Sequence, residues 1–165
     1  MIDKKLFFDN YRKKFGIIYQ EQVEPLETLL KFMENDYRLK DKRHYWAYML
    51  ATTKHETGDT FLPVKEAYWL SENWRKKNLR YYPWYGRGYV QLTWEPNYKK
   101  ASKLIGINFT SDPDLILRYE YSYNVMAHGM ITGWFTGKSL RDYLDKEPRD
   151  LFKAFVKIVC MVRIE

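Results

Sequence analysis

The chain has 165 residues, of which 45% are hydrophobic and 18% aromatic. This length suits one domain with a sizeable core and is too short for two, so we expect a single domain over residues 1–165. No run of about 18 apolar residues occurs, which excludes a membrane span and a signal-peptide core and predicts a cytoplasmic protein without membrane insertion. The single cysteine, Cys160, excludes an internal disulfide.

The formal net charge is +7, from 28 Lys and Arg against 21 Asp and Glu. Five basic residues and no acidic residue lie between positions 75 and 87, namely Arg75, Lys76, Lys77, Arg80 and Arg87. Such a strip attracts polyanions, whether nucleic acid, an acidic membrane or an anionic cell wall. The alternative interpretation is that these residues form an ordinary solvated surface. The charge alone indicates a class of binding partner and does not identify a single one.

Helical periodicity dominates the sequence and no alternating strand pattern persists, which predicts an all-α fold with little or no β-structure. Phe7, Tyr11 and Phe15 repeat every four residues before a glycine, as in a helix that ends at that glycine. A second helix is expected over about residues 20–35. Pro25 lies inside it, and we expect the helix to start near this residue because proline is favoured in a first turn.

A third helix, expected over about residues 41–57, carries Glu56 at the C-terminal end of an otherwise largely apolar stripe. The stripe consists of Tyr45, Tyr48, Met49, Thr52 and Glu56. A long helix is expected over about residues 114–134, where an Asp-Pro pair provides a cap and a first-turn proline. Gly129 and Gly133 on this helix would let another backbone approach it closely.

Two carboxylates are the strongest indication of chemistry. A glycosidase needs one carboxylic acid to protonate the leaving oxygen and a second carboxylate to act on water or to stabilise the cation. Glu56 and Glu66 are ten positions apart, with Gly58 and Pro63 between them, so a turn can bring them opposite each other. For Glu56 alone, a solvated or capping role is the alternative. His55 and Glu56 do not begin a zinc-protease motif, because position 59 is Asp where that motif needs a second His.

An aromatic tract precedes a pair of glycines. The segment reads Tyr81-Tyr82-Pro83-Trp84-Tyr85-Gly86-Arg87-Gly88. It is not a dinucleotide-binding fingerprint, because Gln91 occupies the third glycine position. Aromatic faces stack on sugars and also on nucleobases. We therefore expect the tract to line a surface groove, with a place in the core as the alternative.

Three segments together resemble glycoside hydrolase family 19, which contains plant-type chitinases and many phage and bacterial endolysins. They are His55-Glu56-Thr57-Gly58, Phe61-Leu62-Pro63-Val64-Lys65-Glu66-Ala67-Tyr68, and Tyr85-Gly86-Arg87-Gly88-Tyr89-Val90-Gln91-Leu92-Thr93-Trp94 with Asn97-Tyr98. The resemblance covers roughly residues 6–143 and is closest to the short, endolysin-like members. It implies a lysozyme-like bundle of helices around a substrate cleft.

The resemblance also implies roles for single residues. Glu56 matches the general acid and Glu66 the second carboxylate, while Thr93 occupies the Ser or Thr position that holds the attacking water. Gln91 and Asn97 match positions that bind the sugar acetamido groups. We expect further substrate contacts from His55, Trp84, Tyr85 and Arg87. The implied mechanism is single-step inversion at a β-1,4 bond, which needs neither a cofactor nor a metal.

The chain departs from the family pattern near its C-terminal end. Family members usually continue with an Arg-rich helix and an Asn-Gly segment, whereas no Asn-Gly pair occurs here after Thr93. The part from about residue 147 to 165 is therefore atypical. A substitute helix and a truncated or frame-shifted reading frame are the two interpretations, and both bear on whether the chain is fully active.

The first expectation for function is a glycosidase that degrades bacterial peptidoglycan, since the basic strip favours an anionic polymer. Such an enzyme would act as a monomer and reach the cell wall on lysis. A chitinase that acts on chitin is the alternative within the same class. A non-catalytic module that binds glycan or nucleic acid is the alternative of another class. The two glutamates argue against nucleic acid, because acidic side chains repel a phosphate backbone.

Overall fold

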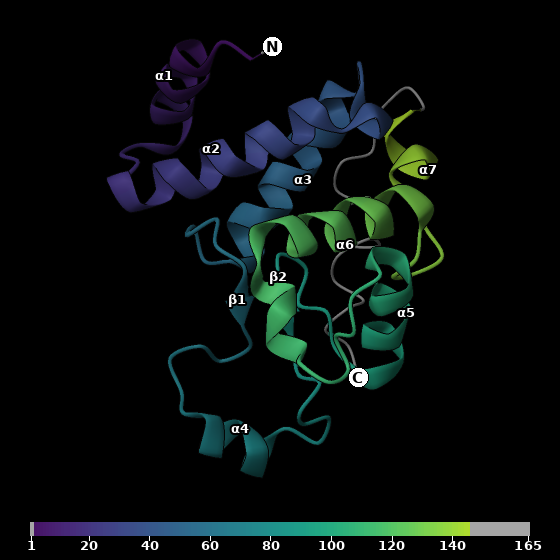
Figure 1. Ribbon diagram of the computed structural model, residues 1–165. Helices are drawn as coiled ribbons and strands as arrows, with labels where there is room; N and C mark the ends of the chain where they lie inside the picture. Colours follow the sequence, from purple (N-terminus) through teal and green to yellow (C-terminus); the bar gives the residue numbers. More distant parts are fainter. Residues whose placement is uncertain (1, 146–165) are drawn as a thin grey trace.

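A computed structural model describes residues 2–145 and shows a bundle of helices (Figure 1). In chain order the elements are α1 (Lys4–Phe15), α2 (Gln20–Asn35), the 3-10 helix η1 (Tyr37–Leu39), α3 (Arg43–Glu56), β1 (Val64–Lys65), α4 (Glu72–Asn78), β2 (Arg87–Gly88), α5 (Glu95–Ile105), the 3-10 helix η2 (Pro113–Leu117), α6 (Tyr119–Thr132) and α7 (Leu140–Leu144). The prediction of an all-α fold with little β-structure is confirmed, since the two strands of two residues each form one antiparallel pair.

The main core lies where α2, α3, α5, α6 and α7 meet. The predicted stripe of α3 faces it, with Tyr45, Tyr48, Met49 and Thr52 buried. The centre of α6 contributes Met126 and Met130, which are fully buried. Burial of these apolar side chains supplies most of the stability of such a bundle. The stripe therefore fixes the rotation of α3 and the place of Glu56 at its end.

A second, smaller core attaches α1 to the rest of the molecule. It consists of Phe8, Ile18, Leu26, Leu30 and Phe61. These five residues come from α1, from the segment that follows it, from α2 and from the loop after α3. In Figure 1, α1 lies at the outer edge of the bundle, beside one end of α2. This small apolar cluster, together with an ion pair between Lys4 and Glu27 of α2, attaches the N-terminal helix.

The start of α2 differs from the prediction. The helix begins at Gln20 and Pro25 lies inside it. The first turn is stabilised by the side chain of Gln22, whose Oε1 accepts from the backbone N–H of Tyr19 at 2.8 Å. Pro25 lacks the N–H for one intrahelical hydrogen bond, and the helix nevertheless continues through it.

The long helix predicted over residues 114–134 is in fact two helices. Arg118 has an extended backbone (φ −66°, ψ 134°) and separates η2 from α6. The break allows two polar contacts that a continuous helix would not make together. Asp114 in η2 accepts from Arg87, and the Oγ of Ser122 in α6 accepts from the backbone N–H of Tyr89. Long-range contacts have overridden the helical pattern here.

The prediction for the two glycines of α6 is confirmed at only one of them. Gly133 ends the helix with a φ of +75°, and the backbone of Lys138 lies within 3.1 Å of where its Cβ would be. At Gly129, by contrast, the ring of Phe135 fills the place of a Cβ. A side chain, and not a backbone, therefore approaches the middle of α6.

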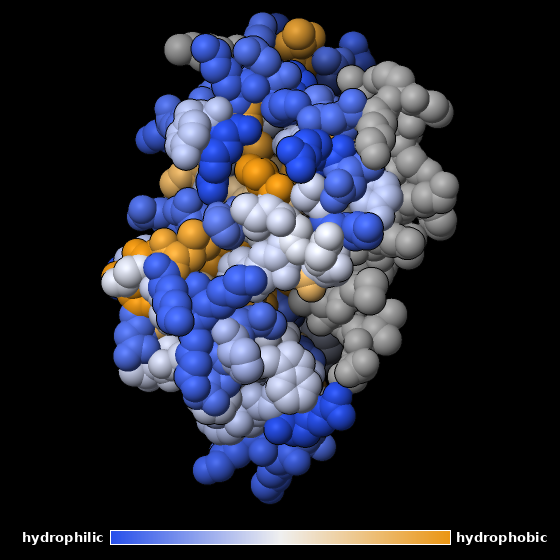
Figure 2. Space-filling model, turned by 90° about the vertical axis from the view of Figure 1, so that its right-hand side faces the viewer, coloured by the Kyte–Doolittle hydropathy of each residue, from blue (hydrophilic) through white to orange (hydrophobic). Residues whose placement is uncertain are grey.

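The last described residue joins α7 to the start of α3. The carboxylate of Asp145 accepts from Lys42 Nζ at 2.8 Å and lies 3.0 Å from His44 Nε2. The atypical part predicted for about residues 147–165 lies outside the described residues. Between residues 2 and 145 no helix is both long and apolar enough to cross a bilayer. The face drawn in Figure 2 is largely hydrophilic, with apolar side chains gathered near its middle.

Candidate active site

The loop between α3 and α5 places the second glutamate near the end of α3. β1 pairs with β2 in the register Val64 to Gly88 and Lys65 to Arg87. The next residue, Glu66, continues the ladder, because its N–H donates to the carbonyl of Gly86 at 2.7 Å. Glu56 is the last residue of α3. The turn expected between the two glutamates therefore exists.

Both glutamates line one cavity of about 260 Å³. Its lining comprises His55, Glu56, Thr57, Gly58, Val64, Lys65, Glu66, Ala67, Tyr68, Trp69 and Gln91. Four of the predicted site residues are among them: His55, Glu56, Glu66 and Gln91. The structure thus brings together residues from the end of α3, from β1 and the segment after it, and from the turn after β2.

The carboxylate of Glu66 is held by two donors. The hydroxyl of Tyr81 donates to its Oε1 at 2.7 Å, and the N–H of Gly86 donates to its Oε2 at 2.9 Å. Burial and the bond to this carboxylate raise the pKa of Tyr81 to about 12, so the phenol stays protonated and remains a donor at neutral pH. Because both bonds are donated to the carboxylate, they fix its plane and direction.

Gly86 allows the close packing around this carboxylate. A Cβ at this position would lie 2.8 Å from Gln91 Oε1 and 3.2 Å from Glu66 Oε2. The backbone nearby is also unusual, since Ala67 and Gln91 have φ values of +48° and +52°. Non-glycine residues rarely adopt this conformation, and such residues cluster at functional sites. The backbone of the segments that carry Glu66 and Gln91 is therefore held in a specific and rarely adopted conformation.

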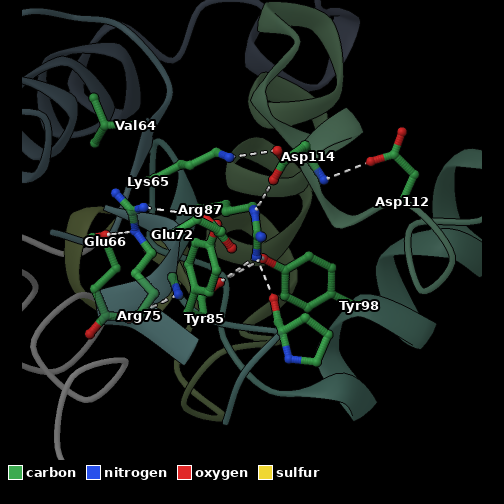
Figure 3. Close-up of polar contacts among 12 residues, drawn as sticks. Val64, Lys65, Glu66, Glu72, Arg75, Tyr85, Arg87, Tyr98, Asp112 and Asp114 are labelled. Atoms are coloured by element: carbon green, nitrogen blue, oxygen red, sulfur yellow. Dashed lines mark hydrogen bonds and ion pairs between the residues drawn. The ribbon is translucent and has the colours of Figure 1, made fainter. Parts of the chain in front are cut away.

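Arg75 joins α4 to the backbone on either side of this site. Its side chain is 5% exposed. Its Nε donates to the carbonyl of Glu66 and an Nη to the carbonyl of Ala67, both at 2.8 Å. The other Nη lies 3.2 Å from Glu72 Oε2, which also accepts from the hydroxyl of Tyr85 at 3.0 Å. One guanidinium thus fixes the peptide that follows the glutamate (Figure 3).

Arg87 supports the same loop from below. It is 3% exposed, and its guanidinium lies 3.6 Å from the ring centre of Tyr85. Its Nε donates to Asp114 at 2.7 Å, and the same carboxylate accepts from Lys65 (Figure 3). Burial alone would raise the pKa of Asp114, but hydrogen bonds from Lys65 and Arg87 lower it below its usual value. The ion pairs of Asp114 with Lys65 and Arg87 therefore join η2 to the β1–β2 pair.

The roles predicted for Tyr85 and Arg87 as substrate contacts are revised by this burial. Tyr85 is fully buried and Arg87 almost so, and neither is part of the cavity lining. The basic strip is revised as well. Arg75 and Arg87 make internal bonds, so only Lys76, Lys77 and Arg80 present their charges to solvent.

The other three predicted residues are not part of the cavity lining. Thr93 is 9% exposed, and its Oγ1 donates to the carbonyl of Gln91 at 2.8 Å, which leaves the hydroxyl oxygen as an acceptor. Asn97 Nδ2 donates to the carbonyl of Thr93 at 2.8 Å. Trp84 is partly buried against the main core. A chain of bonds therefore links Asn97 and Thr93 to Gln91 in the cavity wall.

Sequence reasoning missed four residues of the site. Tyr81 and Arg75 hold Glu66, while Tyr68 and Trp69 line the cavity with 58% and 71% of their surfaces exposed. Tyr81 lies in the aromatic tract, so that tract was a usable signal for it. Arg75 stands beside two solvent-exposed lysines in the sequence, and nothing local distinguishes it from them.

The buried charge of Arg87 predicts a large effect on stability. Asp114→Asn leaves the guanidinium buried without a counter-ion, and we expect a loss of about 3 kcal/mol in the free energy of unfolding. Because the pKa of Asp114 is lowered in the folded state, its contribution is present above about pH 4 and is lost as the pH falls further. Urea titrations at pH 7 and pH 3 measure both effects.

The matched control for that experiment is Lys65→Met, which removes the more exposed partner of the same carboxylate. Its cost is expected to stay below about 1 kcal/mol. Equal losses for the two variants would contradict a special role of the buried arginine.

Known proteins match the region that contains this site. The sequence model of glycoside hydrolase family 19, described as chitinase class I, matches residues 37–140. Basic endochitinase CHB4 from Brassica napus is 30% identical over 106 residues, 61% of this chain and 37% of that protein. Endochitinase EP3 from Arabidopsis thaliana is 33% identical over 82 residues, 46% of this chain and 30% of that protein. Chitinase C from Streptomyces griseus HUT6037 has a TM-score of 0.44 at 25% identity, over 69% of this chain and 47% of the other.

The matched regions amount to about a third of the length of the two plant relatives. The family match, in contrast, spans more than half of this chain and includes Glu56, Glu66 and every other predicted site residue. The chain therefore belongs to glycoside hydrolase family 19.

Proposed function

We propose that this chain is a glycoside hydrolase that cleaves β-1,4 bonds in polymers of N-acetylhexosamine. One observation carries the proposal: Glu56 and Glu66 line the same cavity, and Glu66 is oriented by Tyr81 and Gly86. Hydrolysis of a glycosidic bond requires two carboxyl groups with separate roles. The names of the matched plant proteins, both endochitinases, agree with this reaction class.

In this mechanism Glu56 protonates the glycosidic oxygen and the bond to the anomeric carbon breaks. Glu66 takes a proton from the attacking water, which adds to the opposite face of the sugar ring in the same step. The oxygen of Thr93 accepts a hydrogen bond from that water. The amide of Gln91, which faces Glu66 across Gly86, binds an acetamido group. Inversion follows because the water attacks directly, without a glycosyl-enzyme intermediate.

The exposed aromatic side chains of the cavity provide the sugar-binding surface in this proposal. Tyr68 and Trp69 lie two and three positions after Glu66 and pack edge to face with ring centres 5.1 Å apart. Large apolar rings in a concave site are commonly ligand contacts. Each ring offers a face to the apolar side of a sugar, next to the carboxylate that acts on water.

Peptidoglycan is the polymer that we favour over chitin. The helix α4 follows the aromatic pair and carries Lys76 and Lys77, both exposed. Peptidoglycan differs from chitin in bearing peptide carboxylates, which these ammonium groups would attract. The net charge of +7 acts in the same direction. Chitin remains the alternative because the matched relatives are endochitinases.

Clearing of purified peptidoglycan, with colloidal chitin in parallel, tests both the activity and the polymer. The wild-type chain is expected to clear peptidoglycan faster. Lys76→Glu/Lys77→Glu is expected to lower that rate about tenfold at low salt, with the difference shrinking as salt is added, and to leave the rate on chitin unchanged. Lys103→Glu on α5 is the control for charge reversal elsewhere. Equal losses on both polymers would contradict charge selection, and clearing of chitin alone would identify a chitinase.

A further inference from the structure

Large apolar side chains that are exposed to solvent gather in two places on residues 2–145. One group, Leu62, Tyr68, Trp69, Trp74 and Trp94, belongs to the loop region around the cavity. The other group, Leu6, Phe15, Ile17 and Tyr19, belongs to α1 and the segment after it. Only Tyr37 and Leu104 fall elsewhere in the described part of the chain. Tyr68 and Trp69 of the first group line the cavity and have a role in the proposed hydrolysis, which leaves the second group without one.

The second group differs in chemistry from a sugar-binding surface. Phe15, Ile17 and Tyr19 are 57%, 77% and 63% exposed, and we call residues 12–19 the N-terminal tip. Gly16, with a φ of +86°, ends α1 and turns the chain there. Ile17 is the most exposed of the three and is aliphatic, so it has no flat face to stack on a sugar or a base. Its exposure to water is unfavourable unless an apolar phase covers it.

Basic side chains surround these apolar ones. Residues 4–19 contain five Lys and Arg and one Asp, a local net charge of +4. Arg12, Lys13 and Lys14 directly precede Phe15, and all three are exposed. The acid in this stretch, Asp9, pairs with Arg12 at 3.3 Å, and the next acid along the chain is Glu21 at the start of α2. The tip therefore combines apolar and cationic side chains.

An apolar groove lies directly behind the tip. It has a volume of about 330 Å³ and runs between α1 and α3. Its lining is Phe7, Asn10, Tyr11, Phe15, Leu26, Ala47, Leu50, Ala51, Lys54 and Phe61. Ala47 and Ala51 lie one turn apart on α3 and leave space that larger side chains would fill. Lys54 stands at the groove with its ammonium 5.4 Å from the ring centre of Phe15.

We propose that the N-terminal tip binds reversibly to the surface of an anionic lipid bilayer. Ile17, Phe15 and Tyr19 would enter the boundary between headgroups and acyl chains, and the groove behind them would accept part of an acyl chain. Arg12, Lys13 and Lys14 would meet the lipid phosphates. Peripheral segments bind membranes through this combination of apolar side chains and attraction to anionic lipids. A nucleic acid or a glycan would give the aliphatic side chain nothing to contact.

Co-sedimentation of the whole chain with vesicles tests the proposal. Binding is expected to vesicles of phosphatidylglycerol and phosphatidylcholine in equal parts, and not to pure phosphatidylcholine, and it should weaken as salt is added. Ile17→Ser and Lys13→Glu/Lys14→Glu are each expected to lower the partition coefficient about tenfold. All three positions are exposed, so the variants should fold. Glu56→Gln should bind as the wild type does, because this surface is separate from the proposed hydrolysis.

The matched controls lie on α5, where Lys103 and Leu104 form a similar exposed pair. Lys103→Glu and Leu104→Ser should leave vesicle binding unchanged. The proposal would be overturned if the wild-type protein does not bind anionic vesicles, or if the tip variants bind them as well as the wild type does. It is also overturned if sedimentation velocity shows a dimer that Ile17→Ser dissociates, since a second copy would then cover the tip.

Discussion

Glu56→Gln is expected to lower the rate of glycan hydrolysis by about 10²- to 10⁴-fold, the usual contribution of a general acid. The amide has nearly the same size and keeps polar atoms in the cavity wall, but it cannot give a proton to the glycosidic oxygen. Binding of a chitin oligosaccharide should therefore remain close to that of the wild type. Release of reducing ends measures the rate, and calorimetry measures the binding.

Glu95→Gln is the control for that substitution. This residue lies at the start of α5, where it pairs with Lys99 at 2.8 Å, outside the lining of the cavity. A Glu56→Gln protein with wild-type turnover would contradict the assignment of Glu56 as the general acid. A nucleic-acid-binding module would behave differently again, because the loss of an acidic group would strengthen its binding and no polymer would be cleaved.

Arg75→Gln is expected to lower turnover about 100-fold, although its side chain is not part of the cavity lining. The substitution removes the two donors that hold the carbonyls of Glu66 and Ala67, and a displacement of about 1 Å in a catalytic group costs a loss of that order. We expect the effect in kcat and not in KM, measured on a neutral chitin oligosaccharide. Arg75→Lys should restore only part of the rate, because one ammonium cannot reproduce the planar fork of donors.

Lys77→Gln, two positions along the same helix, is the control because its side chain is exposed. Circular dichroism and a urea titration must show that Arg75→Gln is folded at the assay temperature. A folded Arg75→Gln protein with the kcat of the wild type would show that the arginine only attaches α4 and does not position Glu66.

Helices were predicted at α1, α2, α3 and α6, where apolar residues recur with a helical period, whereas α4, α5 and α7 were not predicted. The stripe that ends at Glu56 is the clearest case. Two of the errors occurred where a distant contact decides the local structure. The predicted long helix is broken at Arg118, where Asp114 bonds to Arg87 and Ser122 bonds to the backbone of Tyr89. Neither of these distant contacts can be predicted from the local sequence pattern. The short helix α4 was missed for a similar reason, since Arg75 holds it in place.

The site was predictable in part. His55, Glu56, Glu66 and Gln91 were named from motifs and do line one cavity, whereas Tyr85 and Arg87 were expected to contact the substrate and are buried outside the cavity lining. Composition marks a residue as basic or aromatic, but it does not say which way the side chain faces. In the loop between α3 and α5 that direction depends on tertiary hydrogen bonds and not on a period.

The β1–β2 ladder has a consequence for how this protein can change over evolutionary time. β1 and β2 form two residue pairs, extended by the Glu66–Gly86 hydrogen bond and the Arg87–Leu92 bridge. Most of the loop lies outside this short pairing, so its shape is specified largely by individual side chains and by the missing Cβ of Gly86. Apolar residues in the helices can be exchanged for one another while the bundle persists. In this loop, few substitutions would leave the structure unchanged. Divergence should therefore accumulate in the helices and on the outer surface, while the loop that holds Glu66 stays nearly constant.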